Sequence, residues 1–210
     1  MRLYRSFATV GGFTIISRVL GFARDVLIAA VLGTGWVADA FFVAFRFPNL
    51  FRRLFAEGAF NSAFVPLFSK RLEGEGESAA RKFAEEALAV LLFALLLFTA
   101  VAEAAMPWLM YVIAPGFAED PEKFDLATLL TRIAFPYLLC MSLVALLSGV
   151  LNALGKFAMA AAAPIILNVV LIGVMVAALA LGLGDEPASG IILAWGVSVA
   201  GFLQLLALAL

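Results

Sequence analysis

Five arginines and two aspartates lie between positions 18 and 53 of a chain that is 65% hydrophobic. They are Arg18, Arg24, Asp25, Asp39, Arg46, Arg52 and Arg53. A charged side chain at the centre of a membrane helix costs roughly 2.5 to 3.5 kcal/mol unless it faces water, a partner or a substrate. The cluster therefore indicates a functional site. Its excess of Arg over Asp favours an anionic substrate, because a guanidinium group binds phosphate in a bidentate manner.

The charges in the second hydrophobic stretch follow helical spacing. Asp39, Arg46 and Arg53 are seven residues apart, which places them within about 40° of one another on a helix. Glu57 follows Arg53 by four residues, a spacing that permits an ion pair. Arg52 lies off this polar stripe in an ideal helix. The second helix is therefore predicted to carry one polar face along its length.

The first hydrophobic stretch carries charges with the same spacing. Arg18 and Asp25 are seven residues apart and share one face of a helix. Arg24 lies on another side unless Gly21 permits a local irregularity. Asp25 is predicted to take part in gating or in a salt bridge.

A second interpretation is that these charges pair with one another and hold two helices together. Arg18 with Asp39, or Arg53 with Glu57, would satisfy it. Such pairing does not absorb the whole set, because five arginines face two aspartates. Arg52 and Arg53 also fit as cytoplasmic anchors near a helix end.

The composition predicts an all-α polytopic membrane protein. Charged residues make up 14% of the chain, against about 25% in soluble domains. Uncharged runs cover residues 87–102, 104–118, 133–155, 157–184 and 187–210, and three of them exceed the ~20 residues that span a bilayer core. The net charge of −1 gives no reason to expect nucleic acid. With no histidine and one cysteine, we expect neither an enzyme nor a metal site.

We predict six spanning helices in one domain, residues 1–210. Their approximate ranges are 6–31, 35–55, 83–113, 126–151, 158–182 and 189–210. The stretches 70–78 and 115–125 are expected to be loops. Proline at positions 136 and 164 is expected to break the fourth and fifth helices, as in transporters that hinge, or to leave a static kink there. Basic residues favour the N-terminus and the second and fourth loops, which predicts a cytoplasmic N-terminus. The apolar end at Leu210 suggests part of a longer or split protein.

Two stretches carry a resemblance to a known family. The run SRVLGFARDVLIAAVLGTGWVADAFFVAFRFPNLFRRLFAEGAFNSAFVP at 17–66 and the run GVLNALGKFAMAAAAPIILN at 149–168 are similar to the MurJ (MviN) lipid II flippases. The resemblance covers the chain from end to end. It implies the six-helix N-terminal lobe of a multidrug/oligosaccharidyl-lipid/polysaccharide exporter fold, related to the MATE transporters. A second lobe would come from further sequence or a partner chain.

The resemblance also implies a function and a location. Lipid II, a precursor linked to undecaprenyl pyrophosphate, would move from the inner to the outer leaflet of the bacterial cytoplasmic membrane by alternating access. The matching cavity residues are Arg18, Arg24, Arg52 and Asp39, and Arg46 stands where the family accepts Lys or Arg. No cofactor is implied, and coupling to the membrane potential or to a monovalent cation stays open. The alternatives are another exporter of this fold, for drugs or polysaccharide units, and a half-size membrane scaffold.

Overall fold

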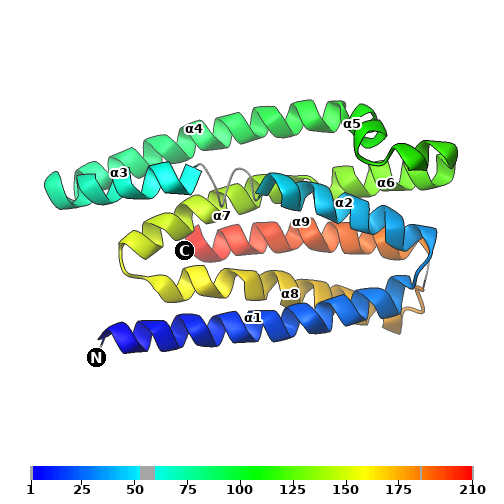
Figure 1. Ribbon diagram of the computed structural model, residues 1–210, viewed down its shortest axis with the longest axis horizontal. Helices are drawn as coiled ribbons and strands as arrows, with labels where there is room; N and C mark the ends of the chain where they lie inside the picture. Colours follow the sequence, from blue (N-terminus) through cyan, green and yellow to red (C-terminus); the bar gives the residue numbers. More distant parts are fainter. Residues whose placement is uncertain (1, 53–59, 185, 210) are drawn as a thin grey trace.

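A computed structural model describes residues 2–52, 60–184 and 186–209, and every regular element within these ranges is helical. The elements are α1 (Arg2–Leu32), α2 (Trp36–Arg52), α3 (Phe60–Gly74), α4 (Glu77–Ala104), α5 (Met106–Ile113), the 3₁₀ helix η2 (Pro115–Glu119), α6 (Pro121–Ala134), α7 (Pro136–Ala153), α8 (Phe157–Ala180) and α9 (Pro187–Ala209). Most of them run along one common axis (Figure 1).

The helix α9 lies in the middle of the bundle, against α7, α8, α6 and α2. Small residues allow this close packing: a Cβ atom added at Gly201 would lie 2.8 Å from Cδ2 of Tyr137 and 3.1 Å from Cβ of Cys140. The main apolar core joins α9 to its neighbours through buried residues such as Phe41, Leu130 and Leu193. By contrast, α1 packs mainly on α8.

Four helical stretches are long and apolar enough to cross a membrane. They are Glu77–Ala104, Pro121–Ala153, Phe157–Ala180 and Pro187–Ala209. The helix α1 carries Arg18, Arg24 and Asp25, and α2 has 17 residues. Neither α1 nor α2 is among the four stretches, so the expected total of six spans remains a prediction.

The turns gather at two opposite ends of the bundle (Figure 1). The α3–α4 and α7–α8 turns lie at the end where the chain begins. The α1–α2 and α8–α9 turns and the start of α6 lie at the other end. Lys123 is the basic residue at that second end, whereas Lys70, Arg71, Arg81, Lys82 and Lys156 flank the turns of the first. The predicted orientation depends on this difference in basic residues between the two ends.

The polar stretch 70–78, which we expected to be a loop, is mostly helical. The helix α3 runs to Gly74, and α4 begins after a short turn in which Gly76 has φ +87°. Phe64 of α3 stacks on Phe83 of α4 with 5.4 Å between ring centroids, in a buried cluster that also includes α7. This apolar contact stabilises the end of α3, which the polar composition of residues 70–78 does not predict to be helical.

Two predicted helices are divided. The third predicted helix breaks at Ala105, before Pro107 in the first turn of α5. The fourth begins earlier than expected, at Pro121, and is interrupted at Phe135, because proline at position 136 lacks a backbone donor.

The expected break at Pro164 is wrong. The helix α8 continues through this proline. The neighbouring helix α9 contributes a hydrogen bond there, from Nε2 of Gln204 to the Ala163 carbonyl at 2.7 Å. Such bonds from adjacent helices support proline-containing membrane helices.

Candidate functional site

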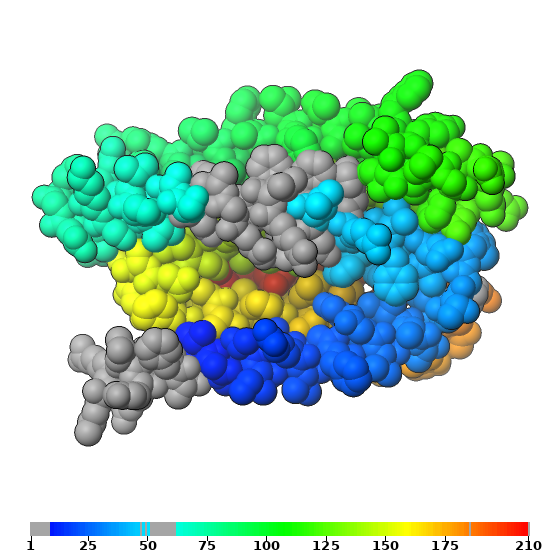
Figure 2. All heavy atoms as spheres, in the orientation of Figure 1, coloured from blue at the N-terminus to red at the C-terminus, as the bar shows by residue number. Residues whose placement is uncertain are grey.

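One face of the molecule is hollowed between α1 and the side formed by α2 and α3 (Figure 2). Parts of α7, α8 and α9 are visible at the base of this hollow. A pocket of about 540 Å³ lies between α1, α7 and α8. It is lined by Val10, Thr14, Ser17, Arg18, Ser148, Asn152, Phe157, Ala160, Ala161 and Pro164.

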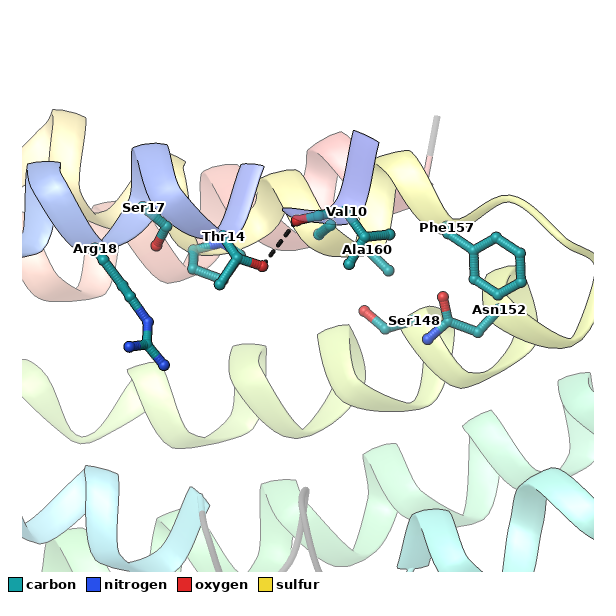
Figure 3. A pocket seen from close by; sticks show the side chains of 10 residues that line it. Val10, Thr14, Ser17, Arg18, Ser148, Asn152, Phe157 and Ala160 are labelled. Atoms are coloured by element: carbon teal, nitrogen blue, oxygen red, sulfur yellow. Dashed lines mark hydrogen bonds between the residues drawn. The ribbon is translucent and has the colours of Figure 1, made fainter. Parts of the chain in front are cut away.

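Arg18 extends from α1 into this pocket, toward α7 (Figure 3). The residue is exposed. No residue in the described part of the chain forms a hydrogen bond or ion pair with its guanidinium group. Arg18 therefore offers all five of its N–H donors to a ligand.

Arg24, almost two helical turns further along α1, is held by two partners. Its Nε and Nη2 atoms donate to Oδ1 of Asp25 at 3.0 and 2.8 Å, and its Nη1 atom donates to Oδ1 of Asn168 at 2.9 Å. The side chain of Arg24 is 18% exposed, whereas that of Asp25 is 64% exposed. The ion pair forms between sequence neighbours although helical spacing places them on different sides.

Asn168 links Arg24 to the backbone of α1. Its side chain is buried, and its Nδ2 atom donates to the Ser17 carbonyl at 2.9 Å. Gly21 faces this amide, and a Cβ atom added there would make ordinary van der Waals contact with it at 3.7 Å. The amide thus bonds both to the α1 backbone and to the Arg24 side chain.

Asp39 lies at the other end of the bundle, in the first turn of α2. Its Oδ2 atom is 2.6 Å from Nζ of Lys123, at the start of α6. Lys123 also lies over the ring of Phe117, 4.3 Å from its centroid. The structure therefore pairs Asp39 with Lys123, and the suggested pair of Arg18 with Asp39 is wrong.

The remaining predicted residues belong to α2 or to the segment after it. Arg46 is exposed and forms no side-chain bond to another described residue. Arg52 is the last residue of α2, and its side chain, like the whole of Arg53 and Glu57, lies outside the described residues. The proposed pair of Arg53 with Glu57 stays a prediction.

The structure therefore places two of the predicted residues, Arg18 and Arg24, on the α1–α8 wall and Asp39 elsewhere. Asn168 was not among the predicted site residues, and its bond to Arg24 joins two helices far apart in the sequence. Lys123 is the one basic residue in its predicted loop, but nothing in the sequence indicated that Asp39 is its partner. Within the described ranges, no cluster of Cys, Asp or Glu could hold a metal ion.

These features define a class: a multi-pass helical membrane protein with a cationic pocket on the wall of its bundle. The sequence matches the family of lipid II flippase MurJ over residues 28–210. The chain belongs to this family.

Individual relatives agree with that assignment. The probable lipid II flippase MurJ of Rhizobium tropici is 56% identical over 98% of this chain and 38% of that protein. The lipid II flippase MurJ of Burkholderia cenocepacia is 43% identical, over 98% of this chain and 39% of its own length. A solved structure of lipid II flippase MurJ in an inward closed conformation is similar with a TM-score of 0.69 and 27% identity, over 94% of this chain and 41% of that one. The chain thus spans less than half the length of these relatives.

Proposed function

We propose that the protein takes part in moving lipid II from the inner to the outer leaflet of the bacterial cytoplasmic membrane. Residues 1–210 would form one six-helix lobe of a two-lobed transporter, with the N-terminus in the cytoplasm. Membership of this family supports lipid II as the substrate. The guanidinium of Arg18, which has no partner among the described residues, supports the mode of binding.

Arg18 and Arg24 of α1 have different roles in the proposed mechanism. Arg18 is free to bind the pyrophosphate of the substrate through charge-assisted hydrogen bonds. Arg24 is partly buried, paired with Asp25 and held against α8, so Asp25 balances its charge and its role is to position α1 against α8. Arg46 and Arg52 would contact the substrate from α2. Rocking of the two lobes would then expose the site to each side in turn.

The free charge in the pocket argues against an exporter of cations. Such a protein needs surplus carboxylates, but Asp25 is bonded to Arg24 and Asp39 to Lys123. A polysaccharide-unit exporter shares the pyrophosphate chemistry and is the remaining alternative within the fold. A half-size scaffold would bind no lipid selectively.

The surplus positive charge also suggests a source of energy. Moving one charge through a membrane potential of 100 mV is worth roughly 2.3 kcal/mol. We infer that the potential, rather than a bound cofactor, resets the lobes after transport. A transport rate that stays constant as an imposed potential is varied would contradict this.

The test is a competition for binding, with the protein at the full length its host encodes, in lipid nanodiscs. Lipid II competes with phosphatidylglycerol on the wild type, on Arg18→Ala and on Arg81→Ala. Arg81 is an exposed arginine of α4 paired with Glu85 and serves as the matched control. We expect selective lipid II binding that falls about 30-fold in Arg18→Ala, equivalent to about 2 kcal/mol, and is unchanged in Arg81→Ala. Equal loss in both variants, or no selectivity in the wild type, would contradict the proposal.

A further inference from the structure

Two polar side chains of α7 face the pocket that Arg18 enters. Ser148 and Asn152 both line it, and their spacing of four residues places them on the same face of the helix (Figure 3). Neither side chain bonds to another residue in the described ranges. Ser142, the other serine of α7, instead donates to the Leu138 carbonyl of its own helix at 2.9 Å.

The wall on α1 carries the hydroxyls of Thr14 and Ser17 beside the guanidinium of Arg18. The hydroxyl of Thr14 donates to the Val10 carbonyl at 2.8 Å (Figure 3), and the Ser17 carbonyl accepts from Asn168. Arg18 therefore provides the charge on one side of the pocket, and Ser148 and Asn152 provide uncharged polar groups on the other.

The remaining wall of the pocket is apolar. It consists of Phe157, Ala160, Ala161 and Pro164 of α8, and Phe157 stands beside Asn152 (Figure 3). An apolar lining with a few convergent polar groups is typical of sites for small molecules. The arrangement suits a ligand with an anion next to an uncharged polar group.

We infer that Ser148 and Asn152 bind the uncharged part of the substrate headgroup that adjoins its phosphate. Serine hydroxyls and asparagine amides both donate and accept hydrogen bonds. They therefore match hydroxyl and acetamido groups of a sugar better than they match phosphate oxygens, which only accept. Arg18 binds the phosphate, and Phe157 packs against the apolar face of the sugar. This inference rests on the proposed function and assigns to the two α7 residues the recognition of the sugar.

The experiment compares three lipids on the full-length protein in nanodiscs. They are lipid II, undecaprenyl pyrophosphate, which lacks the sugars and peptide, and phosphatidylglycerol, which carries a phosphate beside hydroxyls. The variants are Ser148→Ala, Asn152→Ala and the double variant, with Ser142→Ala as the control on the same helix. Because Ser148 and Asn152 have no partner among the described residues, their removal should leave the unfolding temperature unchanged.

We expect the double variant to bind lipid II about tenfold more weakly, as the loss of two hydrogen bonds predicts. Its affinity for undecaprenyl pyrophosphate should stay within about twofold of the wild type, and Ser142→Ala should bind all three lipids normally. Unchanged lipid II binding, or equal weakening for lipid II and undecaprenyl pyrophosphate, would overturn the inference. Equal weakening for phosphatidylglycerol would assign the pocket to ordinary phospholipids and also overturn it.

The wild-type result distinguishes a failure of this inference from a failure of the proposed function on which it rests. A wild-type protein that prefers lipid II while the double variant behaves normally contradicts only the role of α7. A wild-type protein with no preference for either pyrophosphate lipid over phosphatidylglycerol contradicts the proposed function, and the inference fails with it.

Discussion

The Nη1 atom of Arg24 lies 2.9 Å from the Oδ1 atom of Asn168, an amide on a helix 144 residues away in sequence. The same amide donates to the Ser17 carbonyl, so one buried side chain sets the position of Arg24 and joins α1 to α8. Arg18, six residues earlier, has no such tether in the described structure. The two arginines of α1 therefore differ in role: one is held in position and the other is available to a ligand.

Asn168→Leu should destabilise the protein. It removes both hydrogen bonds and leaves a partly buried guanidinium with one partner fewer, at a cost of about 1 to 3 kcal/mol. Asn152→Leu is the control, because Asn152 is exposed and has no described partner. Thermal unfolding in detergent measures both, and equal unfolding temperatures for the two variants would count against the tether.

Asp39 and Lys123 should be energetically coupled. Their side chains are 57% and 19% exposed, so the coupling is expected to be modest, about 0.5 to 1 kcal/mol. A double-mutant cycle with Asp39→Asn and Lys123→Met measures it. Exchanging the two residues, with Asp39→Lys and Lys123→Asp together, should recover much of the stability that either single exchange loses. Additive effects in the cycle would show that the contact contributes nothing.

Gly201→Ala should be markedly destabilising, because its Cβ atom would lie 2.8 Å from the ring of the buried Tyr137. Overpacking of this kind costs about 1 to 3 kcal/mol. Gly173→Ala in α8, where an added Cβ meets nothing within 4 Å, should be neutral or slightly stabilising, since alanine favours helix. The two unfolding temperatures are compared directly, and a neutral Gly201→Ala would mean that α7 and α9 are less closely packed.

The predicted orientation can be tested by cysteine labelling without removing the native cysteine. Cys140 is fully buried and should not react. The cysteine of Glu75→Cys, in the α3–α4 turn, should react with an impermeant maleimide only after the membrane is opened. The cysteine of Glu119→Cys, in η2, should react in intact spheroplasts. The reverse pattern would place the N-terminus outside.

The sequence predicted those features that local pattern determines. Long apolar runs indicated the helices, and the excess of arginine over aspartate indicated an anion site. The pairs of Arg24 with Asn168 and Asp39 with Lys123 were not predictable, because they join residues 144 and 84 positions apart. The helical course of α3 through Lys70 was missed for a similar reason, since its stability comes from Phe64 packing on Phe83 in the next helix.

The most direct measurement is the appearance of lipid II in the outer leaflet of cells whose own lipid II flippase has been replaced by this protein. Wild type, Arg18→Ala and Arg81→Ala are compared at equal membrane abundance. We expect transport by the wild type and by Arg81→Ala, and a rate of about one tenth of the wild-type rate or less in Arg18→Ala, because charge-assisted hydrogen bonds are lost. Transport by Arg18→Ala at the wild-type rate would contradict the claim that this arginine holds the pyrophosphate.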